Sequence, residues 1–203
     1  MKKSFPTAVA LALAGMVMAS SAQAMDITFH GLIHEKTVNL THNGSTMSVR
    51  AGDFLIEFDG QQHVAYCVDL DHVIKNAWTA STAPVTVLNG GLAIAWLYDT
   101  YAHTITTDVE AAGLQVAIWE ILDDFGGALD AASGSFVLNS PTAVRNAAQG
   151  YLNSLPVDLS NYTTSSYILM SGNSPRSQNL IVPEPGTLAL LGLSVVPVIT
   201  RRR

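Results

Sequence analysis

The sequence of 203 residues predicts one α+β domain, in which an antiparallel β-sandwich or barrel-like part carries an inserted helical part. Three observations favour this class. Apolar residues alternate along the first half, recur at helical spacing in the middle, and return in short runs near the end. No repeat or linker divides residues 25–182, which we expect to share one hydrophobic core.

The first half is expected to form strands joined by tight turns. Aromatic and β-branched residues alternate from 54 to 58 and run into Asp59-Gly60, a dipeptide typical of two-residue hairpins. Asn43-Gly44 predicts an earlier turn of the same kind. Beyond Gly60 the alternation predicts a strand through residue 70, which has Val64, Tyr66, Val68 and Leu70 on one face and His63, Ala65, Cys67 and Asp69 on the other.

The middle of the chain is expected to be helical. Gly90-Gly91 precedes apolar residues at helical spacing as far as Tyr101. Thr107 and Glu110 form the pattern of a capping box, which predicts a helix over residues 108–124.

The rest of the domain is expected to return from helix to strand. Gly126-Gly127 ends the second helix, and Ser140-Pro141 begins a third with proline at its first position. Strand-like runs at 167–170 and 179–182 flank a polar loop at 171–177.

The N-terminus is predicted to be a signal peptide over residues 1–24. Lys2-Lys3 precedes an apolar run, and Ala22-Gln23-Ala24 supplies the small-x-small pattern that signal peptidases accept. The mature chain is then exported and begins at Met25.

Residues 183–203 resemble the PEP-CTERM sorting signal of Gram-negative bacteria. Pro183-Glu184-Pro185 is followed by a short apolar stretch and by three arginines at the end of the chain. The resemblance implies processing by an exosortase and delivery to the outer surface or extracellular matrix. The apolar stretch is short for a membrane span, so we expect membrane contact only through this sorting helix, transiently at the inner membrane.

Charge excludes some classes of partner. Residues 25–182 hold five basic and fifteen acidic side chains, a net charge of −10. Nucleic acids and anionic lipids both reward clustered lysine and arginine, so neither is an expected partner.

Two residues stand out as candidates for chemistry. Cys67 is the only cysteine of an exported chain and has no internal disulfide partner. Gln115 lies in the run 114–119, where nearly every other position is apolar, so its carboxamide is expected to be buried. A buried carboxamide must be paired. Gln115 therefore either bonds a neighbouring main chain or is itself a reactant.

The two candidates lie in motifs that resemble the thioester domains of bacterial surface proteins. The motifs are Tyr66-Cys67-Val68-Asp69 and Gln115-Val116-Ala117-Ile118-Trp119, in this order and 48 residues apart from cysteine to glutamine. The resemblance extends loosely over residues 52–182. Leu114 stands where that family commonly has threonine, and the best-known members are wall-anchored proteins of Gram-positive bacteria.

The resemblance implies an internal thioester between Cys67 and Gln115, formed with release of ammonia and without a cofactor. A nucleophile such as an amine on a surface or polymer would then displace the cysteine and become bonded to residue 115. The chain would react once, so it is not expected to be an enzyme. We expect Tyr66, Trp96, Tyr98 and Trp119 to exclude water, and Asp69, with His63 on the same strand face, is a candidate for proton transfer.

Other functions stay open at this point. A non-covalent structural or binding component of extracellular polysaccharide or biofilm would leave Cys67 a plain thiol. A hydrolase would need Cys67, His63 and Asp69 to converge, although all three lie within seven residues of one predicted strand. A metal site is not expected. The spacing of the histidines does not fit a zinc-binding helix, and Asp69 and Asp71 with His72 do not have the spacing of a calcium loop. The six histidines are His30, His34, His42, His63, His72 and His103.

Overall fold

The computed structural model of the chain describes residues 24–184. The predicted signal peptide and sorting signal lie outside these residues, apart from Ala24, Pro183 and Glu184. Within the described part, no helix combines the length and apolarity that crossing a membrane requires.

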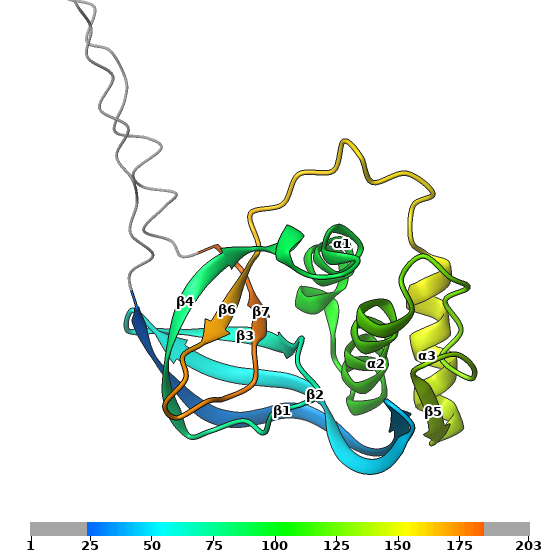
Figure 1. Cartoon of the computed structure of the whole chain (residues 1–203), viewed down its shortest axis with the longest axis horizontal. Coiled ribbons are helices and arrows are strands. Elements are labelled where there is room, and N and C mark those ends of the chain that lie inside the picture. Colours follow the sequence, from blue (N-terminus) through cyan, green and yellow to red (C-terminus); the bar gives the residue numbers. More distant parts are fainter. Residues whose placement is uncertain (1–23, 185–203) are drawn as a thin grey trace, which may run out of the picture.

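The strands form one antiparallel sheet that closes on itself, which confirms the predicted α+β class with a barrel-like part (Figure 1). Going round the ring, the order is β1-β2-β3-β7-β6-β4 and back to β1, while β5 joins the far end of β1. The bounds are β1 (Met25–His42), β2 (Ser45–Phe58), β3 (Gln61–Cys67), β4 (Ala77–Pro84), β5 (Val137–Ser140), β6 (Tyr167–Ser171) and β7 (Leu180–Val182).

Both predicted hairpin turns are confirmed. Asn43 and Gly44 join β1 to β2 with φ values of 51° and 73°, and Asp59 and Gly60 join β2 to β3 with 51° and 70°. Two consecutive left-handed residues match the right-handed twist of the strands, which is why Asn-Gly and Asp-Gly fit here.

The predicted extension of β3 to Leu70 is wrong, because the strand ends at Cys67. The Asp69 carboxylate accepts a hydrogen bond from the Asp71 main-chain N–H at 3.0 Å. This local turn competes with a strand ladder and bends the chain away from the sheet.

Three α-helices lie together beside the barrel: α1 (Gly91–Tyr101), α2 (Asp108–Asp124) and α3 (Thr142–Asn153). Short 3₁₀ turns cover Val85–Val87 and Ala102–Thr104. α2 has the predicted bounds and the predicted capping box. α3 begins one residue later than predicted, because Pro141 has an extended backbone and caps the helix instead of starting it.

α2 is the central element, since it lies between the barrel and α3 (Figure 1). Every residue from Ala111 to Ile121 is buried. A Cβ atom at Gly113 would lie 2.6 Å from the Ala147 Cβ, so glycine is what lets α2 and α3 approach this closely. A helix that is apolar on all sides belongs in a core, and this position was predictable from the sequence.

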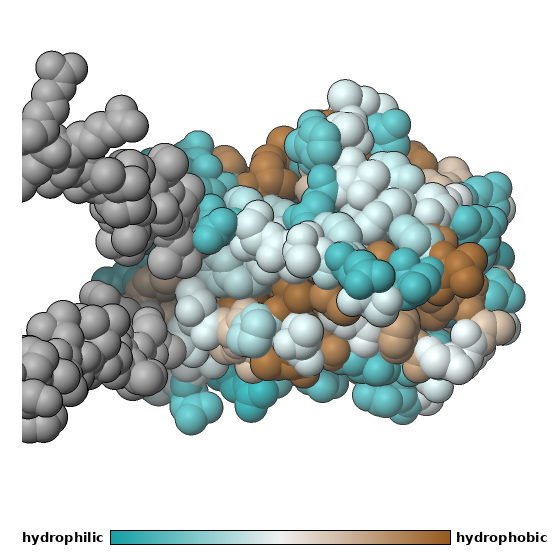
Figure 2. Space-filling model, turned by 90° about the horizontal axis from the view of Figure 1, so that it is seen from above, coloured by the Kyte–Doolittle hydropathy of each residue, from teal (hydrophilic) through white to brown (hydrophobic). Residues whose placement is uncertain are grey.

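The outer surface is mixed in character. Seen from above in Figure 2, apolar residues appear as separate brown patches among polar ones, without one continuous apolar face on this side.

One acidic group is enclosed with the α2 core. Glu120 is fully buried, and its Oε1 accepts a hydrogen bond from the Asp130 main-chain N–H at 2.8 Å, while Oε2 has no partner. Burial raises the pKa of Glu120 to about 7. The Asp130 N–H opposes this rise, and the nearby charges of Asp123 and Asp124 add to it.

This raised pKa predicts a pH-dependent stability. Glu120 ionises near 4.5 in the unfolded chain and near 7 in the folded one, so unfolding releases a proton between these values. The free energy of unfolding should therefore fall as pH rises through this window. Glu120→Gln should flatten the fall, whereas Asp26→Asn at an exposed position of β1 should not. Urea unfolding at several pH values measures both, and equal slopes in wild type and Glu120→Gln would contradict the prediction.

Candidate functional site

The site is built where β3 ends. The Val68 N–H donates to the Asn179 carbonyl at 2.9 Å, so Val68 and, by alternation, Tyr66 direct their main-chain groups toward β7. Cys67, between them, directs its N–H and C=O to the opposite side. The pairing of β2 with β3 covers Ala65 but does not reach Cys67. Cys67 is thus left with two buried main-chain groups that need a partner.

Gln115 of α2 takes the place of the missing strand. Its Nε2 donates to the Cys67 carbonyl at 2.8 Å, and its Oε1 accepts from the Cys67 N–H at 2.8 Å. Both residues are fully buried. The carboxamide therefore pairs with the main chain of the one cysteine, and this pairing fixes the carboxamide carbon beside Cys67.

The pairing also sets the direction from which sulfur would approach. Hydrogen bonds between strands lie in the sheet, whereas side chains stand out of it. Because the Gln115 amide bonds to the Cys67 main-chain groups in the direction in which strands pair, the Cys67 side chain leaves the strand roughly perpendicular to these bonds. A nucleophile attacks an sp² carbon from its face, so the arrangement suits attack by Sγ on the carboxamide carbon.

The Cys67 sulfur is held as a thiol. Its Sγ–H donates to the Asp69 carbonyl at 3.0 Å, and the Asp69 N–H lies 3.3 Å from the sulfur. Burial raises the pKa of the Cys67 thiol to about 12, against the opposing effects of the Asp69 N–H and the Trp119 indole. Trp119 Nε1 has no hydrogen-bond partner of ordinary geometry, but it lies close enough to favour a thiolate.

Asp69 contacts the sulfur through its main chain, whereas its carboxylate is bound elsewhere. Both carboxylate oxygens lie 2.9 Å from His72 Nδ1. His63 is four residues from Cys67 along β3, about 13 Å at the rise of a strand, and its ring stacks on Phe58 at 4.1 Å. The structure therefore does not bring Cys67, His63 and the Asp69 carboxylate together as a hydrolase would require. The role of Asp69 in proton transfer stays a prediction.

Three of the four aromatic residues expected to exclude water are buried. These are Tyr66, Tyr98 and Trp119, and the rings of the first two meet edge to face at 6.2 Å. Trp96 is half-buried on the outer side of α1, where it packs against Tyr101. The water-excluding role of Trp96 stays a prediction, because helical spacing alone does not tell which flank of an apolar helix faces outward.

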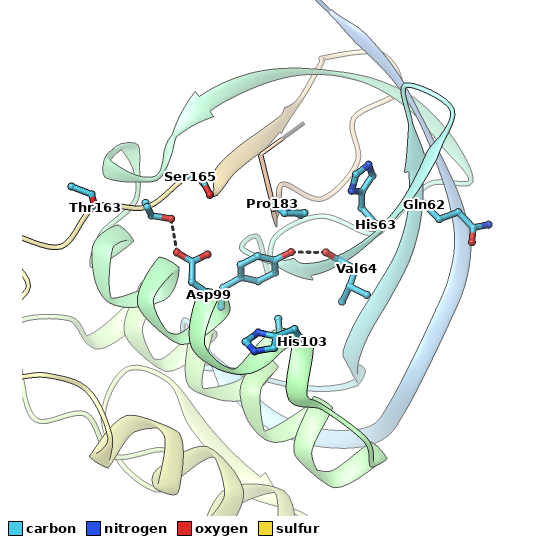
Figure 3. A pocket seen from close by; sticks show the side chains of 11 residues that line it. Gln62, His63, Val64, Asp99, His103, Thr163, Ser165 and Pro183 are labelled. Carbon is cyan, nitrogen blue, oxygen red and sulfur yellow. Dashed lines mark hydrogen bonds between the residues drawn. The ribbon is translucent and has the colours of Figure 1, made fainter. Parts of the chain in front are cut away.

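A cavity of about 640 Å³ opens between the start of β3 and the end of α1 (Figure 3). The Tyr98 hydroxyl crosses its wall to donate to the Val64 carbonyl at 2.7 Å. Neither Cys67 nor Gln115 lines it.

A second cavity of about 310 Å³ begins at the residue after Cys67. Val68, Asp69 and His72 line it together with His42 and Asp123. The pairing of His42 with Asp123 could not be predicted from the sequence, because the two residues are 81 positions apart and no local pattern links them.

Within residues 24–184, no three His, Cys, Asp or Glu side chains are placed to share a metal ion. Comparisons with models of protein families, with curated proteins and with solved structures found no match.

The two hydrogen bonds of Gln115 should be measurable as stability. In a Cys67→Ala background, where no thioester can form, Gln115→Ala should lower the free energy of unfolding by about 3 kcal/mol, since it leaves buried main-chain groups unpaired. Gln62→Ala at an exposed position of β3 is the control and should change it by less than about 0.5 kcal/mol. Urea unfolding gives both values, and a loss below about 1 kcal/mol for Gln115→Ala would show that the carboxamide is not held as described.

Proposed function

We propose that this chain forms an internal thioester between Cys67 and Gln115 and uses it once to attach covalently to a nucleophile on a surface or polymer. The observation that supports this most is the double hydrogen bond between the Gln115 carboxamide and the Cys67 main chain. It holds the carboxamide beside the main chain of the residue that carries the thiol, and both residues are buried in the core.

The bond-forming step balances without a cofactor. The Cys67 sulfur attacks the Gln115 carboxamide carbon, the C–N bond breaks, and the thiol proton leaves with the amide nitrogen as ammonia. Because burial disfavours the thiolate, the attack depends on holding the two groups close together, which lowers the activation barrier. The same burial keeps water from the product, so the thioester would persist until a suitable nucleophile enters.

The predicted sorting signals give this chemistry a location. Export through the signal peptide and processing by an exosortase would deliver the domain to the outer surface or matrix of a Gram-negative cell. An amine there would become bonded to residue 115, and Cys67 would be released as a thiol. The reaction consumes the site, so this function is adhesion or cross-linking, without turnover.

A non-covalent matrix component is the alternative, and the larger cavity favours it. Its polar wall includes Asp99, which accepts hydrogen bonds from Tyr162 Oη at 2.5 Å, Thr164 Oγ1 at 2.6 Å and Ser166 Oγ at 2.5 Å. These contacts already satisfy the carboxylate and hold the connection between α3 and β6 against α1. The cavity therefore has a structural explanation, and the thioester is the stronger proposal.

The deciding measurement is the intact mass of the purified protein with and without methylamine. We expect a wild-type mass that is lighter by one ammonia and that becomes the methylamine adduct on incubation. Cys67→Ala and Gln115→Ala should show neither change, since each removes one partner of the bond.

A full unmodified mass together with one titratable thiol would contradict the thioester. The non-covalent role would then lead, and Leu114→Thr would test whether the residue before Gln115 had abolished the reaction.

A further inference from the structure

One face of α2 leads from the reacting pair to the smaller cavity. Gln115, Trp119, Leu122 and Asp123 are spaced by four, seven and eight residues from the first, so they follow one another along the same side of the helix. Gln115 is fully buried, whereas Leu122 and Asp123 line the cavity. Trp119 therefore stands on this face between the open space and the Cys67–Gln115 pair.

The chain after β3 forms another wall of the same cavity. Val68 and Asp69 line it, and the Asp69 main chain touches the Cys67 sulfur at 3.0 Å. The cavity thus borders the sulfur through a single residue. The larger cavity in Figure 3 has no such contact with the pair.

His42, the last residue of β1, faces this cavity as an oriented base. Its Nδ1 lies 2.6 Å from Asp123 Oδ2, and its Nε2 lies 2.9 Å from Asn43 Nδ2. In the neutral ring, Nε2 accepts from the Asn43 amide while Nδ1–H donates to Asp123, and in the protonated ring Nε2–H can donate to Asp71. Nε2 is also 3.4 Å from the exposed carboxylate of Asp71.

We propose that the smaller cavity is the entrance for an incoming ammonium group, and that His42, oriented by Asp123, removes its proton before it attacks the thioester. This inference rests on the proposed function. It adds a catalytic base and a route to a site whose two reacting residues are both sealed from solvent.

The ammonium gives a proton to His42 Nε2, and the free amine attacks the acyl carbon of residue 115. The C–S bond breaks, and the nitrogen loses its second proton as the Cys67 thiolate gains one. An amide and a thiol remain, and one proton passes from His42 to solvent.

The charges around the cavity suit a cation. Asp69, Asp71 and Asp123 line it, with Arg176 as the basic side chain and His42 and His72 as the titratable rings. Burial lowers the pKa of His42, but the hydrogen bonds and charges of Asp123 and Asp71 outweigh this and leave it raised above 6.5. The Trp119 Nε1–H is buried without a hydrogen-bond partner and acts to lower the pKa of the Cys67 thiol, so it is a donor that a departing thiolate could use.

Comparing two amines tells whether His42 acts as a base or only as a structural contact. Methylamine is protonated at neutral pH and must lose a proton before it attacks, whereas hydroxylamine is already neutral. In the wild-type protein, adduct formation with methylamine should speed up as pH rises through the pKa of His42. His42→Gln should slow the methylamine reaction about 100-fold and the hydroxylamine reaction by less than about threefold. Added imidazole should partly restore the methylamine rate.

His30→Gln is the matched control, because His30 pairs with Glu57 on the surface of the barrel and does not line the cavity. It should leave both rates unchanged. Asp123→Asn provides a second test that does not need the His42 variant to fold. It removes a charge that raises the pKa of His42, so the pH midpoint of the methylamine reaction should move down.

Each outcome has one meaning. A wild-type protein that has not lost ammonia would overturn both the proposed function and this inference. A wild-type thioester that reacts with methylamine at the same rate in His42→Gln would overturn this inference alone. Equal slowing of both amines would also overturn it, because a contact that only shapes the cavity affects both.

Discussion

The pairing of one side-chain amide with one residue's main chain constrains the arrangement of the elements around it. Gln115 supplies the hydrogen bonds that a neighbouring strand would otherwise give to Cys67, so α2 must lie against the end of β3 at one height and one rotation. A shift of α2 by one turn would move the carboxamide by about 5.4 Å and leave buried polar groups unpaired. The closed barrel fixes β3, and the α2–α3 contact at Gly113 fixes the helix.

In the proposed function, the same arrangement separates the reacting pair from the place where a nucleophile would enter. Cys67 and Gln115 are fully buried, which suits an activated bond that water must not reach. The titratable side chains of His42 and Asp123 lie further from the core, where they line the smaller cavity. α2 joins the two zones, since one of its faces carries Gln115 at its middle and Asp123 at its end. Trp119 occupies the space between them.

Local chemistry explains which parts of the structure were predictable. The two hairpins follow from Asn-Gly and Asp-Gly, and the start of α2 follows from Thr107 and Glu110, because each feature is settled by residues a few positions apart. The end of β3 was not predictable in this way. Alternation continues to Leu70, but the Asp69 carboxylate bonds to its own chain and ends the strand. The inward or outward flank of α1 likewise depended on packing, as Trp96 shows.

By itself the sequence determined the class of fold, the burial of the α2 region and the choice of Cys67 and Gln115 as the candidate pair. The first two rest on periodicity and composition, which are local or additive, and the third rests on the resemblance of two motifs to the thioester domains of bacterial surface proteins. Only the tertiary structure decided that the carboxamide pairs with the Cys67 main chain, that Asp69 contacts the sulfur through its backbone, and that His42 meets Asp123. Such contacts join residues far apart in the chain, and their partners are set by barrel closure and helix packing, which no short stretch of sequence encodes.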